Sequence, residues 1–146
     1  MSYPIHRYPL TVLEIHLDLL GHVNNAMYLT LFEEARWDLI TRNGYGVDKI
    51  KETGLSPVVL EFKIKFLREL TLRKKVVIET QLLSMTKKIC HIHQTIKSEN
   101  GEITYTKVDL TCGLFDLAQR KLITATPEWI RGIGASNSLS HTWPQD

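Results

Sequence analysis

Six residues between positions 18 and 28 combine the side-chain types that chemistry at a carbonyl group needs. They are Asp18, Gly21, His22, Asn24, Asn25 and Tyr28. The pattern after Asn24 is helical, and the start of a long helix presents unpaired backbone N–H groups and the positive end of the helix dipole. Such a helix start can polarise a carbonyl oxygen. A carboxylate at Asp18 can then attack the carbonyl carbon or activate a water molecule, and Gly21 allows a tight turn beside the ligand.

Each of these residues also has a purely structural interpretation. An aspartate before a helix is more often a turn or capping residue than a catalytic group. His22 fits a histidine that braces the loop as well as it fits a base or a substrate-binding group. Asn24 and Asn25 fit helix caps and dimer contacts as well as they fit substrate ligands. The residue types and their spacing therefore leave the roles open.

Glu33 and Glu34 are reserve candidates for a catalytic carboxylate. They lie about two turns into the predicted helix. An ion pair with Arg36 or Arg42, or a solvated helix edge, explains both glutamates better than catalysis does.

The segment from Asn25 to Arg42 is predicted to form the helix that positions these groups. Its apolar residues cover so much of its circumference that other structure must surround it. Asn24 and Asn25 supply an N-terminal cap, and the pair Asn43-Gly44 supplies a C-terminal stop. The residues predicted on its principal apolar face are Tyr28, Leu31, Phe32, Ala35 and Leu39.

Alternation of apolar and polar residues predicts five strands in the rest of the chain. They cover residues 8–17, 60–66, 76–82, 90–96 and 103–115, with a hairpin turn at Asn100-Gly101. A short second helix is predicted from Val47 to Glu52 and a helical turn from Pro127 to Ile130. One strand, a helix and then a run of antiparallel strands indicate an α+β fold. We expect a curved antiparallel sheet of five or six strands wrapped around one long central helix.

The composition fits a single globular domain. The chain has 146 residues, a formal net charge of +2 and no basic tail, so nucleic-acid binding is not expected. It has no apolar run of signal-peptide length and no stretch of the ~20 apolar residues that span a membrane, so we predict a cytoplasmic protein. We place the domain at residues 1–133 and a loosely ordered tail at residues 134–146.

Cysteine and histidine usage carries little functional signal. Cys90 and Cys112 lie in apolar segments, where we expect two buried reduced thiols, although a disulfide between them is possible. His91 and His93 alternate on one predicted strand, but no third ligand is apparent and zinc sites have three or four. We therefore predict a polar strand face, with no metal and no redox cofactor.

The segment DLLGHVNNAMYLTLFEEAR resembles the signature of the 4-hydroxybenzoyl-CoA thioesterase family of hotdog proteins. That signature is approximately D-x-x-G-H-V-N-N-x-x-Y, followed by a helix that carries F-E-x-A-R. The stretch VVLEFKIKFLRELTLRKKVVIET is similar to the family's second and third strands, and ITATPEW is similar to its closing strand and Pro turn. The resemblance covers roughly residues 8–131. Two departures are His16, where many relatives have a second acid, and Leu20, where plant acyl-carrier-protein thioesterases have a functional asparagine.

The resemblance implies an acyl-CoA thioesterase that hydrolyses an acyl thioester to the free acid and CoA. Asp18 would be the nucleophile or general base, and the helix-start amides near Asn24 and Asn25 would form the oxyanion hole. Tyr28 and its neighbours would line the acyl pocket. The resemblance also implies a homodimer or homotetramer with active sites between subunits, and basic residues such as Arg68, Lys74 and Lys75 are candidates for the CoA phosphates. The alternatives are an acyl-carrier-protein thioesterase and a non-catalytic hotdog protein that binds acyl thioesters.

Overall fold

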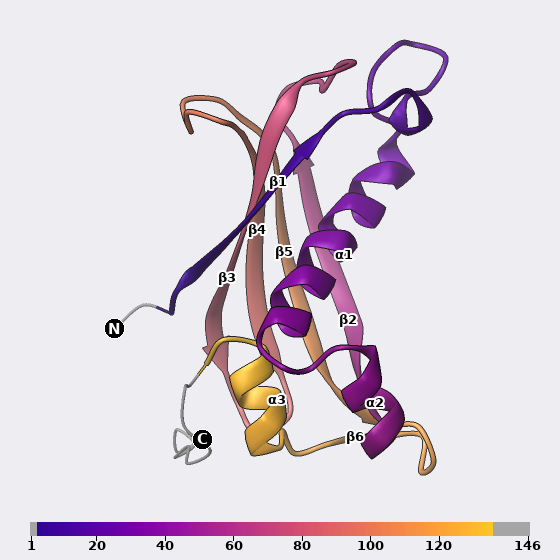
Figure 1. The fold of residues 1–146 in the computed structure, drawn as a ribbon, viewed down its shortest axis with the longest axis vertical. Coiled ribbons are helices and arrows are strands. Elements are labelled where there is room, and N and C mark those ends of the chain that lie inside the picture. Colours follow the sequence, from indigo (N-terminus) through magenta and orange to yellow (C-terminus); the bar gives the residue numbers. More distant parts are fainter. Residues whose placement is uncertain (1–2, 136–146) are drawn as a thin grey trace.

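The computed structural model describes residues 3–135, which form one six-stranded antiparallel sheet with three α-helices (Figure 1). The strands are β1 (Ile5–Thr11), β2 (Leu55–Phe66), β3 (Lys75–Met85), β4 (Cys90–Ser98), β5 (Thr104–Asp116) and β6 (Lys121–Ile123). The helices are α1 (Asn25–Arg42), α2 (Val47–Thr53) and α3 (Pro127–Gly132), with a short 3-10 helix, η1 (Glu14–His16), after β1.

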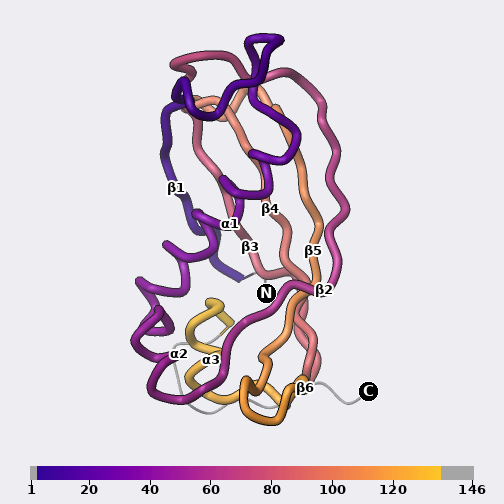
Figure 2. The backbone as a smooth tube through the Cα atoms, turned by 90° about the vertical axis from the view of Figure 1, so that its right-hand side faces the viewer, coloured from indigo at the N-terminus to yellow at the C-terminus, as the bar shows by residue number. Residues whose placement is uncertain are grey.

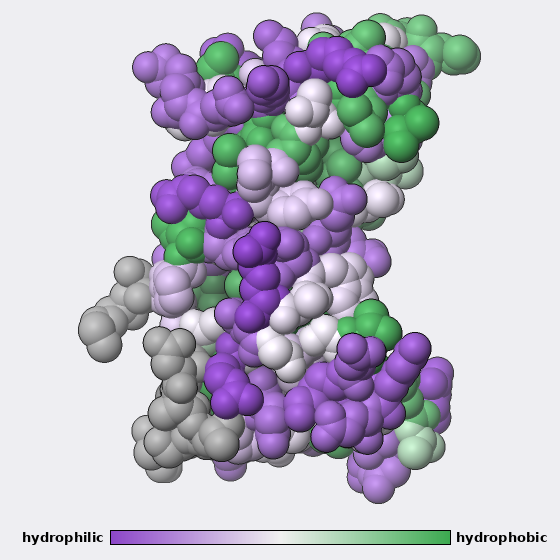
Figure 3. Space-filling view, in the orientation of Figure 1, coloured by the Kyte–Doolittle hydropathy of each residue, from purple (hydrophilic) through white to green (hydrophobic). Residues whose placement is uncertain are grey.

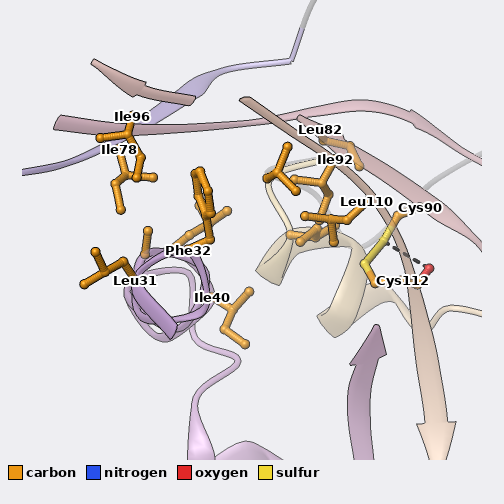
Figure 4. Close-up of a cluster of buried hydrophobic side chains, with 14 of the residues drawn as sticks. Leu31, Phe32, Ile40, Ile78, Leu82, Cys90, Ile92, Ile96, Leu110 and Cys112 are labelled. Atoms are coloured by element: carbon orange, nitrogen blue, oxygen red, sulfur yellow. Dashed lines mark hydrogen bonds between the residues drawn. A yellow bond between two sulfur atoms is a disulfide. The ribbon is translucent and has the colours of Figure 1, made fainter. Parts of the chain in front are cut away.

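The strand order is β1-β3-β4-β5-β2, and the short β6 pairs with β5. The helices α1 and α3 lie on the same side of this sheet (Figure 2). Phe32 and Ile40 of α1 meet Ile78, Ile92 and Leu110 of the sheet in one buried hydrophobic cluster (Figure 4). This burial stabilises the position of α1, because removing apolar side chains from water contributes about 25 cal/mol per Å².

The helix α1 begins and ends where the sequence predicts. The side chain of Asn24 accepts a hydrogen bond from the Ala26 N–H at 2.9 Å, and Gly44 takes the left-handed conformation, with a φ of 88°, that stops the helix. The predicted buried face is confirmed, since all five of its residues are buried: Tyr28, Leu31, Phe32, Ala35 and Leu39. The helix α1 is one of three helices, and α2 and α3 correspond to the short helix and the helical turn predicted at residues 47–52 and 127–130.

The first strand differs from the prediction at both ends. It is Ile5–Thr11 rather than residues 8–17, because the chain turns into η1 at Glu14.

The predicted apolar face of β2 is only partly buried. Phe62 is half-buried, whereas Leu60 and Phe66 are 47% and 49% exposed. Two features explain this exposure: β2 is an edge strand, and its pairing with β5 is irregular between Val59 and Glu61.

Cys90 and Cys112 are joined by a disulfide, so the prediction of two reduced thiols was wrong for this structure. The two residues are direct partners in the register of β4 and β5, and their Cα atoms are 5.3 Å apart, a separation that suits a disulfide. Their burial was predicted correctly. The register between the two strands is a long-range property, and composition alone does not indicate it.

No helix within residues 3–135 is long and apolar enough to cross a membrane. The division into a domain at residues 1–133 and a tail at residues 134–146 stays a prediction. Apart from Gly134 and Ala135, the predicted tail lies outside the described residues.

Glu79 on β3 connects three neighbouring strands through two ion pairs. One carboxylate oxygen lies 3.0 Å from Arg7 Nε on β1, and the other lies 2.7 Å from Lys97 Nζ on β4. The hydrogen bond from Lys97 is the main reason that the pKa of Glu79 is lowered, and Arg7 lowers the pKa further. A carboxylate with a lowered pKa stabilises the folded state above its unfolded pKa, and this contribution is lost as the pH falls through the folded pKa.

Glu79→Gln should therefore lower the free energy of unfolding by about 1 kcal/mol at pH 7. The difference from wild type should shrink as the pH falls below 4.5 and through the lower pKa of Glu79 in the folded protein, because the glutamate is then protonated and both proteins are uncharged at this position. Urea unfolding at pH 7 and in the acid range measures both effects. Glu102→Gln, at an exposed turn residue, is the control and should change neither value. A constant difference across this pH range would contradict the ion-pair explanation.

Candidate active site

Asp18, Gly21 and His22 lie in one tight hairpin between η1 and α1. Leu17 and Val23 form an antiparallel bridge, the Asp18 N–H donates to the His22 carbonyl at 3.0 Å, and the Gly21 N–H donates to the Asp18 carbonyl at 3.2 Å. Gly21 has a φ of 82°, which a residue without a Cβ adopts at little cost. The glycine predicted for a tight turn therefore occupies the position that requires it.

The Asp18 carboxylate is half-buried and has one oxygen available. Its Oδ1 accepts a hydrogen bond from the Leu20 N–H at 2.8 Å, whereas Oδ2 has no hydrogen-bond partner among residues 3–135. Hydrophobic surface gathers at this end of the molecule (Figure 3), and the neighbouring side chains Leu19 and Leu20 are 104% and 79% exposed. The free oxygen therefore lies in a loop that is open to a ligand and flanked by apolar surface.

The backbone N–H groups at the start of α1 are only partly used by the protein itself. The Asn24 N–H donates to the His16 carbonyl at 3.0 Å, the Ala26 N–H donates to the Asn24 side chain, and the Met27 N–H donates to the Asn24 carbonyl at 2.9 Å. Within residues 3–135, the Asn25 N–H has no acceptor. Asn24 is thus occupied as the cap, and Asn25 is the better candidate for the amide that polarises a carbonyl oxygen.

Tyr28 lies one turn further along α1 and is buried. Its ring packs edge-on against Phe66 of β2, with 5.0 Å between the ring centres. Burial is the largest cause that raises the pKa of Tyr28, and the charges of Glu69 and Asp18 raise it too. The phenol therefore stays protonated at neutral pH.

A second loop, residues 67–74, holds the hairpin in place through backbone contacts. The sequence did not predict these contacts. The Val23 N–H donates to the Leu70 carbonyl at 2.9 Å, and His22 forms a bridge with Thr71. These contacts join segments about 50 positions apart, so neither periodicity nor spacing reveals them. His22 is half-buried, and the role of its side chain stays a prediction.

A cavity of about 340 Å³ lies between α1, β2 and α3, beyond the hairpin along α1. A volume near the lower end of the usual range for small-molecule sites suits a short chain or a ring. Aromatic and aliphatic side chains make up most of its wall. Its lining residues are Glu33, Arg36, Trp37, Ile40, Pro57, Val58, Val59, Phe62, Ile92, Cys112, Trp129 and Ile133.

Arg36 contacts the sheet rather than a glutamate of its own helix. Its Nη1 donates to Gln94 Oε1 on β4 at 2.9 Å, and its guanidinium lies over the Phe62 ring, 5.3 Å from the ring centre. Glu33 accepts a hydrogen bond from Trp37 Nε1 at 3.2 Å, and it forms no ion pair with Arg36. Asp38 is instead the partner of Arg42, at 2.8 Å. The predicted Glu–Arg pair is therefore wrong for Arg36.

His93, on the strand face predicted to be polar, contacts Asp109 of β5, with 2.8 Å between Nδ1 and Oδ1. Within residues 3–135, no group of three histidine, cysteine or carboxylate side chains is placed to hold a metal ion.

The chain belongs to the thioesterase-like superfamily, whose family model matches residues 14–133. This membership confirms the prediction of a thioester hydrolase, and it covers the hairpin, α1 and the whole sheet except β1. The narrower resemblance to 4-hydroxybenzoyl-CoA thioesterases stays a prediction.

Two relatives and two solved structures illustrate the similarity. The chain is 32% identical over 102 residues to the long-chain acyl-CoA thioesterase FadM of Escherichia coli, a match that covers 65% of this chain and 76% of FadM. It is 32% identical over 96 residues to a betainyl-CoA thioesterase of Pseudomonas aeruginosa, covering 66% of this chain and 60% of that protein.

The crystal structure of the probable thioesterase YbaW from Escherichia coli matches with a TM-score of 0.78 and 26% identity, covering 88% of this chain and 98% of that one. A hypothetical protein from Staphylococcus aureus in complex with CoA matches with a TM-score of 0.84 and 18% identity, covering 99% and 92%. At that identity the second match concerns the fold alone, which is the hotdog thioesterase fold.

Proposed function

We propose that this protein hydrolyses acyl-CoA thioesters at the junction between the Asp18 hairpin and α1. The observation that supports this function is that one short segment contains both a carboxylate oxygen and a backbone N–H group without hydrogen-bond partners. Asp18 has a carboxylate oxygen without a partner, and seven positions later Asn25 has a helix-start N–H without an acceptor among residues 3–135. Relatives named as acyl-CoA thioesterases support the substrate class.

In the proposed reaction the thioester carbonyl oxygen accepts a hydrogen bond from the Asn25 N–H. Asp18 acts either as a base that takes a proton from water while the water oxygen bonds to the carbonyl carbon, or as a nucleophile that forms an anhydride which water then cleaves. In both routes the C–S bond breaks, and CoA leaves as a thiolate that takes up a proton. The helix dipole and the free amide stabilise the negative charge on the carbonyl oxygen in the transition state.

Basic residues next to the hairpin are candidates for binding the CoA phosphates. Arg68, Lys74 and Lys75 are exposed and lie at or beside the loop that pairs with His22 and Val23, whereas Arg73 is held by Glu14 at 2.6 Å. The double substitution Lys74→Ala and Lys75→Ala should raise KM about 5- to 10-fold and leave kcat unchanged, because these cations would contact only the remote end of the substrate.

Steady-state kinetics at low and high salt measure this effect, and the KM of wild type should itself rise with salt. Lys51→Ala, on the exposed side of α2, is the control and should behave as wild type. An unchanged KM in the double variant would rule out these lysines as phosphate ligands.

A homodimer or a larger even-numbered assembly is part of the proposal. The strand β2 is twelve residues long, lies at the sheet edge and exposes Val59, Leu60 and Phe66. A long apolar edge strand in a stable protein is normally covered, and pairing with the same strand of a second copy covers it. Light scattering should therefore give at least twice the chain mass, and a monomer at micromolar concentration would contradict this part of the proposal.

The proposed activity is tested by release of free thiol from acyl-CoAs of different chain length and, in parallel, from the same acyl groups on acyl carrier protein. Hydrolysis of acyl-CoA with kcat/KM in the usual range of about 10⁴ M⁻¹s⁻¹ or more is expected. Turnover of the carrier-protein substrates alone would favour the carrier-protein alternative. A folded protein that binds acyl-CoA and releases no thiol would instead be a binding protein.

A further inference from the structure

The cavity beside α1 contains a cation that the protein itself does not neutralise. Arg36 points into the space between α1 and β2, where its neighbours in the cavity wall include Phe62, Ile92 and Trp129. It forms no ion pair with a carboxylate of the described residues. A guanidinium has five N–H donors, and the structure assigns an acceptor to one of them.

Gln94 holds this arginine in place without neutralising its charge. Gln94 is fully buried on β4, and its amide nitrogen donates both to the Phe32 carbonyl at 3.1 Å and to Thr80 Oγ1 at 2.9 Å. These two bonds fix the amide, so its oxygen faces Arg36. The guanidinium is therefore positioned by a rigid neutral acceptor, and its remaining donors are available to a ligand.

The electrostatic state of Arg36 agrees with an uncompensated charge. Burial lowers the pKa of Arg36 to about 10, and the charge of Glu33 only partly offsets this effect. Arg36 is thus still protonated at neutral pH. Burial removes water from the charged guanidinium, and an anionic ligand in the cavity would compensate for this lost hydration.

We propose that this cavity binds the distal end of the acyl group and that Arg36 selects acyl groups that end in a carboxylate. This inference rests on the proposed function, since it names the substrate class of the same site. A carboxylate matches the fork of guanidinium donors, and such charge-assisted hydrogen bonds are stronger than hydrogen bonds between neutral groups. The apolar wall contacts the methylene chain between the thioester and the carboxylate.

The position of Arg36 on α1 determines how long an acyl chain must be to reach it. At 1.5 Å per residue, its Cα lies about 16 Å beyond the start of the helix. A helical side chain leans toward the N-terminus, which brings the guanidinium closer to the helix start. An ω-carboxyacyl chain of about six to ten carbons spans the remaining distance.

A cationic acyl group is disfavoured in the same cavity. The aromatic faces of Trp37, Phe62 and Trp129 would otherwise attract a quaternary ammonium group. The guanidinium of Arg36 already lies over the Phe62 ring and would repel such a ligand. Betainyl-CoA should therefore be a poorer substrate than a neutral acyl-CoA of similar size.

The test is a binding measurement that needs no turnover. It compares suberoyl and octanoyl thioether analogues of CoA, in which a methylene separates the sulfur from the carbonyl carbon, together with the adipoyl–hexanoyl and sebacoyl–decanoyl pairs. Titration calorimetry on wild type should show at least one ω-carboxyacyl analogue binding about 10-fold or more tighter than its matched neutral analogue. Arg36→Gln should abolish this preference. Arg36→Lys should retain part of it, because lysine keeps the charge but lacks the planar fork.

Arg42→Gln is the matched control, since it removes the same charge from the same helix at an exposed position outside the cavity. It should keep the preference of wild type. Equal or weaker binding of every ω-carboxyacyl analogue by wild type would overturn the inference without any variant, and so would a preference that survives in a folded Arg36→Gln. Thiol release from octanoyl-CoA by wild type is measured separately. Hydrolysis without a carboxylate preference overturns the inference and leaves the proposed function standing, whereas a preference in binding without any hydrolysis overturns the proposed function alone.

Discussion

Replacing Asp18 by asparagine should lower kcat for acyl-CoA hydrolysis by about 10²- to 10⁴-fold, the usual contribution of a positioned acid or base. Asparagine has nearly the same shape, and its oxygen can still accept the hydrogen bond from the Leu20 N–H that holds the turn. The hairpin should therefore keep its structure while the reactive carboxylate oxygen is lost. KM should change little, because the substitution removes a group that acts in the transition state.

Two controls separate this prediction from a general loss of fold. The melting temperature of Asp18→Asn should stay within a few degrees of wild type. Glu33→Gln and His22→Gln should each retain most of the activity, since Glu33 is exposed and bonded to Trp37 and His22 forms part of a loop bridge. Full activity in Asp18→Asn would move the chemistry to Glu33, Glu34 or His22.

Replacing Asn25 by proline should lower kcat by about 10²- to 10³-fold, the cost of losing one oxyanion-hole donor. Proline is tolerated at the first position of a helix because the N–H that it lacks has no partner within the helix. Asn24, with a φ of −64° and a ψ of 141°, already has the backbone conformation that a residue before proline needs. The substitution therefore deletes the proposed donor and leaves α1 intact.

Asn25→Ala is the matched control, because it removes the side chain and keeps the backbone N–H. We expect activity close to wild type in Asn25→Ala and a large loss in Asn25→Pro, with similar circular dichroism spectra for both. If both variants lose activity equally, the side chain of Asn25 rather than its amide is what matters. If neither loses activity, the oxyanion hole lies elsewhere.

Local signals in the sequence predicted the elements that carry the site. The cap at Asn24, the stop at Gly44 and the apolar face of α1 are properties of short segments, and all three appear in the structure. The left-handed conformation of Gly21 likewise follows from its place in a short loop. These features depend on neighbours a few positions away, where propensity and spacing are informative.

The features that were missed depend on contacts between distant parts of the chain. Arg36 was a candidate partner of Glu33 or Glu34 on its own helix, whereas its actual partner, Gln94, is 58 positions away on β4. The disulfide between Cys90 and Cys112 depends on the register of β4 and β5. Exposure of Leu60 and Phe66 results from the position of β2 at the sheet edge, which the alternation of residues cannot reveal.

The most direct test of the proposed active site is a crystal structure of Asp18→Asn with an intact acyl-CoA bound. The proposed function predicts the thioester carbonyl oxygen about 2.7–3.1 Å from the Asn25 nitrogen. The carbonyl carbon should lie next to the side chain at position 18, directly or through one water molecule. A thioester bound away from the start of α1, with Asn25 still facing solvent, would contradict the proposed site.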